Sequence, residues 1–263
     1  MTTLFDLTLQ VAKQVTEVIE GTATAGSATT LTDAATLRYP RGFFTRGALW
    51  IKSGTHQGKT VTPTDFADGV LTFATLTTSV GTPRYSVIPE EPYPYQQIVL
   101  AINSALDDSR AWILKKDDTL TGDGETLEFT LPSDVYDVAK VQQFDPAYPD
   151  TRFLSNHWTE QAGKLVFDRN HEPVDGWTIL IWYKGKHTEL TTYSDTLDNS
   201  LSVEWLKWKA TENLLTWSMR RYQNKPEMQL DQFLNQAMDR VSKLRPRREP
   251  LVMIRTASTV DWE

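Results

Sequence analysis

The stretch "VAKQVTEVIEGTATAGSATTLTDAA" (residues 11–35) contains the first change of pattern along the chain. Before it, apolar residues recur at helical spacing and predict one amphipathic helix over residues 3–20. These residues are Leu4, Leu7, Val11, Val15 and Val18. Gly21 is the predicted stop, because glycine is favoured just past a helix end. From residue 22 onward Thr, Ala, Ser and Gly dominate, which predicts that a β region interrupts a helical body.

The β region that follows is predicted to be a small module over residues 22–91. "ALWIKSG" alternates as a strand does, "HQGK" offers a turn at Gly58, and "KTVTPTDFADGVLTF" supplies two more strands around "ADG". Helical periodicity then returns in "EEPYPYQQIVLAINSALDDSRAWILKK", with prolines at its entry. We therefore predict a helix within residues 92–117.

A second β region is predicted over residues 118–199. Its candidate strands are "ETLEFTLP", "YDVAKVQQFD", "RFLSNHWTEQ", "GKLVFDR" and "WTILIWYKG", separated by regular turn signals. That spacing is typical of an antiparallel meander or sandwich.

The last third of the chain is helical again. "SLSVEWLKWKATENLLTWSMRRYQ" (200–223) has two apolar stripes, so we predict a central helix that contacts its own bundle and something else. The second stripe is the candidate for inter-subunit or bundle packing and consists of Trp205, Trp208, Leu215, Met219 and Tyr222. A further helix, within "PEMQLDQFLNQAMDRVSKL", ends before Pro246.

These elements predict an α+β fold with a four-helix bundle body. Residues 1–21, 92–117 and 200–246 would form the bundle, residues 22–91 and 118–199 two antiparallel β insertions, and residues 247–263 an extended C-terminal arm.

Composition excludes several classes of protein. There is no cysteine, which rules out disulfides and thiolate chemistry and suits assembly in a reducing cytoplasm. No apolar stretch approaches a membrane span, and "MTTLFDLTLQ" lacks the features of a signal peptide. The net charge is −7, yet residues 201–263 hold 11 Lys and Arg against 8 Asp and Glu. A basic end against an acidic body is typical of an interaction tail, or of a helix end complementing its dipole.

No motif indicates catalysis or a cofactor. Both phosphate-binding glycine loops are absent, as is a serine nucleophile elbow. The four histidines are scattered, and the acidic "DDTLTGDGETLE" does not match a calcium loop, so a tight turn explains it more simply. We therefore expect no enzyme activity, no metal and no cofactor. Aromatic residues on the β elements could stack sugars, although cross-strand packing explains them more simply: Trp50, Trp158, Trp177, Trp182 and Tyr183.

The C-terminal "LVMIRTASTV" (251–260) is β-prone and apolar where most chains are polar. Burying its first four side chains would contribute roughly 1.5–3 kcal/mol each, whereas ordering ten residues costs roughly 1–2 kcal/mol apiece. Backbone bonds to a sheet edge, arginine contacts or many arms engaging together must add to this burial. The candidate partner-binding residues are Arg247, Arg248, Leu251, Val252, Met253, Ile254 and Arg255. The alternative is that the arm folds back onto its own β region.

Three stretches resemble the head-to-tail adaptor (connector or neck) proteins of tailed bacteriophages. They are "YPRGFFTRGALWIKSGTHQGKTVTPTDF", "IVLAINSALDDSRAWI" followed by "ETLEFTLPSDVYDVAKVQ", and "WLKWKATENLLTWSMRRYQN". The resemblance implies a virion protein of the neck, assembled in the host cytoplasm as a ring of twelve copies on the portal protein. It further implies that the C-terminal arm docks on the portal, that a tail or nozzle protein lies below, and that double-stranded DNA passes through. An acidic lumen would not hold the phosphates of passing DNA. A virion-associated carbohydrate-binding or receptor-binding protein is the alternative, and neither function requires a membrane.

Overall fold

A computed structural model describes residues 2–109, 113–198, 201–221 and 230–244. It divides into two compact units. The first unit comprises Met1–Leu106 and Thr188–Arg245, and the second comprises Asp107–His187.

Two four-stranded antiparallel sheets form the β module of the first unit. One has the order β1-β8-β4-β5 and the other β2-β3-β7-β6. The bounds are β1 Ile19–Thr22, β2 Ala25–Gly26, β3 Thr30–Thr32, β4 Ala48–Ile51, β5 Thr60–Val61, β6 Pro63–Ala67, β7 Val70–Phe73 and β8 Arg84–Ile88. The predicted turns are present: Gly58 has a positive φ, and Asp68 and Gly69 join β6 to β7 with φ of 52° and 75°.

One apolar core fills the space between these two sheets. It includes Leu31, Phe44, Leu49, Ile51, Phe66, Leu71 and Val87. A polar pair lies within it: the Tyr85 hydroxyl donates to Asp33 Oδ2 at 2.8 Å. Gly21 packs against this pair, since a Cβ at residue 21 would lie 2.5 Å from the Tyr85 hydroxyl. Gly21 is therefore required in strand β1 and is not the helix stop that the sequence predicted.

Four helices complete the first unit: α1 Leu4–Val15, α2 Tyr95–Asp108, α3 Val203–Arg221 and α4 Leu230–Leu244. A capping box of Thr3 and Asp6 starts α1, which ends at Val15 rather than at residue 20. The last two residues of the predicted helix, Ile19 and Glu20, instead belong to β1, which pairs with β8 in register Ile19↔Val87.

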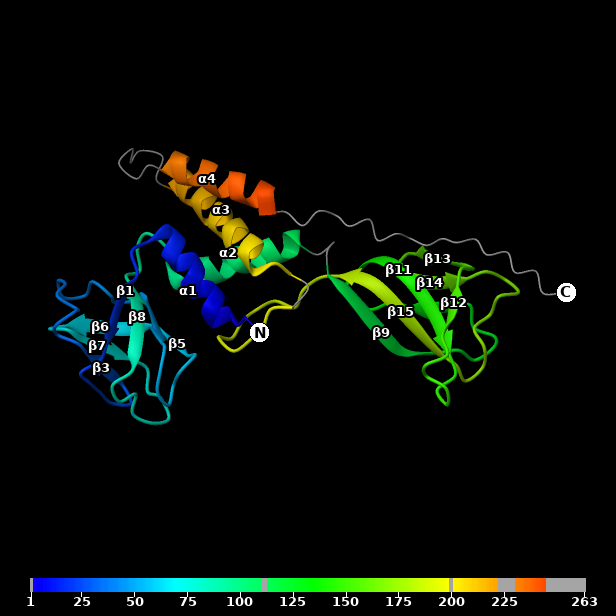
Figure 1. Cartoon of the computed structure of the whole chain (residues 1–263), viewed down its shortest axis with the longest axis horizontal. Helices are drawn as coiled ribbons and strands as arrows, with labels where there is room; N and C mark the ends of the chain where they lie inside the picture. The colour runs from blue at the N-terminus through cyan, green and yellow to red at the C-terminus, as the bar shows by residue number, and fades with distance from the viewer. Residues whose placement is uncertain (1, 110–112, 199–200, 222–229, 245–263) are drawn as a thin grey trace. The chain divides into compact units, whose positions relative to one another are not determined.

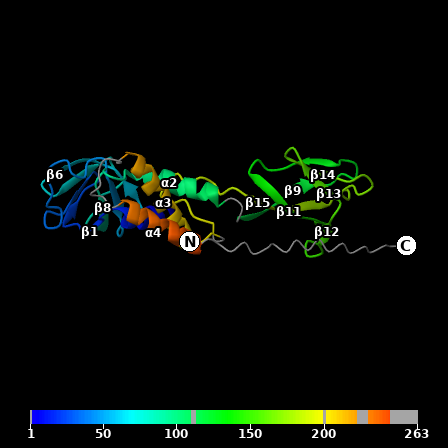
Figure 2. The same ribbon diagram turned by 90° about the horizontal axis from the view of Figure 1, so that it is seen from above.

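The predicted four-helix bundle body is wrong. In the part of the chain that the structure describes, fifteen strands in four antiparallel sheets outweigh the four helices. The helices also pack on the β module and not only on one another: Trp50 on β4 donates from Nε1 to Thr8 Oγ1 of α1 at 3.0 Å and meets the ring of Tyr95 edge-on. Figure 1 shows α3 and α4 running alongside each other, and Figure 2 repeats this from above.

The second unit also holds two antiparallel sheets, with orders β12-β11-β15-β9 and β10-β14-β13. Its strands are β9 Leu114–Thr121, β10 Glu128–Thr130, β11 Val135–Phe144, β12 Phe153–Ser155, β13 Trp158–Gln161, β14 Lys164–Phe167 and β15 Thr178–Gly185. The core between them includes Val141, Leu165, Phe167, Ile179 and Ile181. The predicted antiparallel character of this region is confirmed.

Two details differ from the sequence prediction. Residues 114–117, expected in a helix, belong to strand β9 and pair with β15 in register Lys184↔Leu114. The predicted strand "RFLSNHWTEQ" is split between β12 and β13, which lie in different sheets.

After the second unit, the chain returns to the first unit at Leu190, which is hydrogen-bonded to α2. The Asn103 side chain of α2 donates from Nδ2 to the Leu190 carbonyl and accepts from the Leu190 amide, both at 2.9 Å. The segment after Leu190 then lies against the N-terminus, where the Leu4 amide donates to the Asp195 carbonyl at 2.8 Å.

Candidate functional site

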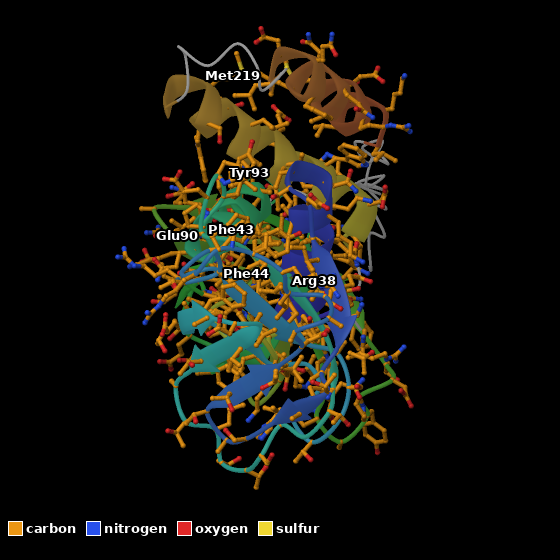
Figure 3. The ribbon with its side chains drawn as sticks, turned by 90° about the vertical axis from the view of Figure 1, so that its left-hand side faces the viewer. Arg38, Phe43, Phe44, Glu90, Tyr93 and Met219 are labelled. Carbon is orange, nitrogen blue, oxygen red and sulfur yellow. The ribbon has the colours of Figure 1, made fainter. Side chains whose placement is uncertain are left out.

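Helix α3 is covered along most of its circumference. Trp205 and Leu215 of the predicted packing stripe are buried, while Trp208 and Met219 are half-buried. Tyr222, the fifth member, lies outside the described residues. Helices α1 and α4 both pack on α3, and Asn213 reaches the Ala101 carbonyl of α2 at 3.4 Å. Most of this stripe is therefore committed to contacts within the chain. Figure 3 labels Met219, which lies on α3 away from the β module.

Trp208 joins α3 to α4 through charge. Its Nε1 donates to Glu204 Oε1 at 3.1 Å, and Lys207 Nζ and Arg240 Cζ lie 5.5 and 6.0 Å from its ring centroid. A hydrogen bond from Lys207 lowers the pKa of Glu204, burial opposes this, and the bond from Trp208 and the charge of Arg240 lower it further. A cation over an indole ring is attracted by the negative face of the ring. This contact places Arg240 of α4 beside Trp208 of α3.

Helix α4 has an apolar face that helix α3 covers only in part. Ala237 is buried at the centre of the face, with Leu234 and Val241 half-buried beside it. Phe233 and Met238 flank the face on opposite sides, and each is 50% exposed. Since 3.6 residues make a turn, these two positions lie roughly 140° apart around the helix. Both flanks of α4 are thus apolar and open.

Trp217 adds a further exposed aromatic residue, with 37% of its surface accessible. From the contact between Trp208 and Arg240, Trp217 lies about 13 Å onward along α3 and Phe233 about 10 Å back along α4. Because the helices are antiparallel neighbours, the two aromatic residues lie at a similar level of the hairpin. We call Trp217, Phe233 and Met238 the open apolar residues of the α3–α4 hairpin.

The candidate partner-binding residues of the arm lie outside the described residues. These are Arg247, Arg248, Leu251, Val252, Met253, Ile254 and Arg255. What the structure does fix is where the preceding helix ends, at Leu244, three positions before residue 247.

The aromatic residues considered for sugar stacking fall into three groups. Trp50 and Tyr183 are buried, so their rings present no face to a sugar. Trp158 and Trp182 are half-buried. Trp158 donates from Nε1 to the Ser155 carbonyl, and Trp182 donates from Nε1 to Gln142 Oε1. Trp177 stacks on the exposed Phe153 at 5.3 Å between centroids. Of the five candidate positions, only Trp177 therefore remains part of an aromatic platform, together with Phe153.

The histidines show no metal geometry. His56 is buried and bonds to Thr78, whereas His157 and His171 stack at 3.6 Å between ring centroids, with Asp168 3.7 Å from His157 Nδ1. Across the described ranges, no group of three His, Cys, Asp or Glu side chains could hold a metal ion. The acidic stretch 117–128 begins within β9 and contains the expected tight turn just after it: Asp123 accepts from the amides of Glu125 and Thr126.

Sequence reasoning missed one surface, the loop between β3 and β4. Arg38, Arg41 and Arg46 are exposed there beside Tyr39 and Phe43. The density of arginine and aromatic residues in "RYPRGFFTR" was an available signal.

None of the helices in the described segments combines the length and apolarity needed to cross a bilayer. No family model matches this chain, and no curated protein matches it.

Proposed function

We propose that this chain is a structural virion protein, a head-to-tail adaptor without catalytic activity. It would form a ring beneath the portal protein, join the portal to a tail or nozzle protein below, and let double-stranded DNA pass. The ring would hold twelve copies, as the resemblance to adaptor proteins implies. The four-helix bundle body that the sequence predicted is not found in the described residues, so the proposal depends on surfaces and not on the body of the fold.

The observation that supports it most is the surplus of apolar surface on the α3–α4 hairpin. Phe233 and Met238 lie on opposite flanks of α4, and Trp217 is exposed at the level of Phe233. Complete burial of such a side chain from water contributes about 1.5–3 kcal/mol, so contacts with other chains that cover the exposed half would gain about half of this per residue. Two opposite flanks suit a ring, in which every subunit has a neighbour on each side.

The C-terminal arm continues from this same hairpin. Its arginines and its apolar run begin shortly after Leu244, so an arm docked on the portal would be tethered to the helix that contacts neighbouring subunits. Identical arms on a ring raise the effective concentration of one another on the portal. This is how a segment with marginal binding energy could hold stably.

The charge of the chain favours passage of DNA over binding it. Residues 107–187 hold 15 Asp and Glu against 9 Lys and Arg, and the other residues are close to balance. An acidic surface repels phosphates and releases few counterions. A strongly basic lumen in an assembled ring would contradict this part of the proposal.

The test is the native mass of the chain co-expressed with the genes that flank its own. The full-length chain is compared with a version stopped after Pro246 and with a full-length control in which Leu251, Val252, Met253 and Ile254 are all serine. We expect a multi-copy complex on a portal-like ring for the full-length chain alone. Stable incorporation of either altered chain would refute the role of the arm, and a lone monomer in all three would refute the adaptor.

A second candidate function is carbohydrate binding by the second unit. Phe153 is 53% exposed and stacks on Trp177, which is the kind of aromatic platform that binds sugar rings. Binding on a glycan array that disappears with Phe153→Ala, and persists with Trp182→Ala, would favour this function.

A further inference from the structure

The loop between β3 and β4 presents cations and aromatic rings together. We call residues 38–46 the arginine–aromatic loop. Tyr39 and Phe43 stack with centroids 4.7 Å apart, and both rest edge-on against Phe44, which is buried in the core. Figure 3 labels Arg38, Phe43 and Phe44, which lie at the end of the β module nearer the helices. The loop therefore has an exposed tip on a buried aromatic base.

This loop is held in one conformation before any partner binds. Its backbone bonds to β6 twice, from the Gly42 amide to the Phe66 carbonyl and from the Arg46 amide to the Pro63 carbonyl, each at 2.8 Å. Arg46 has a φ of 61°, a region that residues other than glycine rarely adopt. A fixed loop loses little conformational entropy when it docks.

The arginines are only weakly engaged within the chain. Arg41 lies 4.0 Å from Asp65 and Arg46 lies 3.9 Å from Glu90, both at the limit for an ion pair and both largely exposed. Ion pairs of this kind contribute about 0–1 kcal/mol. The guanidinium groups can therefore turn to an external carboxylate at small cost, and they offer paired donors for it.

The second unit carries the complementary surface. Three loops meet at one end of it, because the Gly122 amide bonds to the Trp177 carbonyl and the Val174 amide to Gln143. These loops, 122–127, 145–152 and 170–177, hold six carboxylates and one arginine. At the same end Phe153 and Val174 are exposed apolar residues. The carboxylates of this end complement the arginines of the arginine–aromatic loop, and its exposed apolar side chains can pack against the aromatic rings of that loop.

We propose that the arginine–aromatic loop of one copy docks on this acidic end of the second unit of a neighbouring copy. The inference rests on the ring of the proposed function and names one of its contacts. Such a contact is head-to-tail, since the two patches differ, and head-to-tail contacts form a ring when the rotation from copy to copy closes. Arg, Tyr and Phe are the residues enriched at the centres of protein interfaces. A nucleic acid is the less favoured occupant, because the chain as a whole is acidic.

The test is a charge swap measured by sedimentation of the full-length chain alone, without portal. One variant carries Arg38→Glu and Arg41→Glu, a second carries Asp150→Lys and Asp175→Lys, and a third carries all four. The matched control is Lys59→Glu with Arg84→Glu, which changes the net charge equally elsewhere on the same module. Because like charges repel across an interface, each two-residue swap should weaken self-association about tenfold or more. The four-residue variant should recover it, and the control should resemble the wild type.

The outcomes separate this docking from the proposed function. A wild-type chain that remains monomeric would overturn the docking alone, because the ring of the proposed function assembles on the portal and is decided by the co-expression test. A wild-type assembly that survives the arginine reversal, or that is weakened by both swaps and not restored by their combination, would overturn the docking alone. Loss of DNA binding with unchanged self-association in the arginine variant would assign the loop to a nucleic acid and would also overturn it.

Discussion

The β module of the first unit and the second unit are both pairs of antiparallel sheets around one core, but they are stabilised differently. In the first, Trp50 and Tyr85 are completely buried and bond to Thr8 and Asp33. In the second, cross-strand ion pairs such as Lys184–Asp137 lie partly exposed, and Phe129 and Leu131 at the core edge retain some exposure. Pairs of antiparallel sheets can thus be stabilised by fully buried aromatic residues with polar bonds in one unit, and carry partly exposed ion pairs between strands in the other.

The largest expected effect is that of Trp50→Ala. It empties a buried site and removes the bond to α1, so we expect a loss of about 3–5 kcal/mol in the free energy of unfolding of the first unit. Hydrogen exchange of peptides from each unit, followed with urea, measures it. Trp182→Ala is the matched change in the second unit, where the half-buried ring should cost less than half as much. Equal losses would remove the difference between the units.

Tyr85→Phe should have the next largest effect. It leaves the buried Asp33 carboxylate without one donor, at a cost of about 1–3 kcal/mol. Burial raises the pKa of Asp33, but the bonds from Tyr85 and Thr36 more than offset this and bring it below its ordinary value. The variant should therefore also raise the pKa of Asp33, which a carboxyl NMR titration would show.

The control for that change is Tyr183→Phe. The Tyr183 hydroxyl lies 3.3 Å from Asp134, and burial together with this carboxylate raises the pKa of Tyr183 to about 12. Asp134 is partly exposed and also paired with Lys115, so water and the lysine can compensate. A loss as large as that of Tyr85→Phe would contradict the contrast.

Glu20 makes the first unit sensitive to acid. The hydrogen bond from Lys13 lowers the pKa of Glu20 to about 2; burial opposes this, and Lys52 assists. Because the folded pKa lies below the ordinary value, the stabilisation is present above about pH 4.5 and is lost as pH falls through about 2. Between pH 5 and 2.5 the wild type should lose more stability than Glu20→Gln, by about 1 kcal/mol or less for such exposed pairs. Parallel urea midpoints in the two proteins would indicate that the lysines do not act on Glu20.

The smallest effect is expected for Lys184 and Asp137, which face each other across β15 and β11. Their side chains are 26% and 40% exposed, so a double-mutant cycle with Lys184→Met and Asp137→Asn should give a coupling of about 0.5 kcal/mol or less. A coupling of several kcal/mol would mean that ion pairs stabilise the second unit as strongly as burial stabilises the first.

Local pattern predicted most of the elements but not what they pack against. The stripes of α2, α3 and α4 and the turns at Gly58 and Asp68–Gly69 follow from periodicity and turn chemistry. The prediction of a four-helix bundle was wrong because an apolar stripe on a helix does not show which element packs against it. Helix α1, for example, accepts a hydrogen bond at Thr8 from Trp50 of a sheet. The prediction of a helix at residues 114–117 was wrong because this charged segment shows little alternation of apolar and polar residues. Its strand conformation arises from pairing with β15.

The candidate site was predictable only in part. The double stripe of α3 correctly indicated a central helix, but sequence could not tell that Trp205 and Leu215 are used within the chain. Exposure of Phe233 and Met238 depends on how narrow the facing surface of α3 is, which no pattern within α4 reveals. Trp50 is likewise excluded as a sugar-stacking residue because it is buried, and its burial arises from tertiary packing that the sequence pattern does not reveal.

The two hydrogen bonds between the Asn103 side chain and the Leu190 backbone bear on how this protein can evolve. They bring the chain back to α2 only five residues before that helix ends at Asp108. Departure and return are thus neighbours in space, the arrangement that tolerates insertion and excision of whole domains. A short linker in place of residues 109–187 would leave the helices and their β module intact. We accordingly expect that the second unit could be removed or exchanged while the rest of the protein keeps its fold.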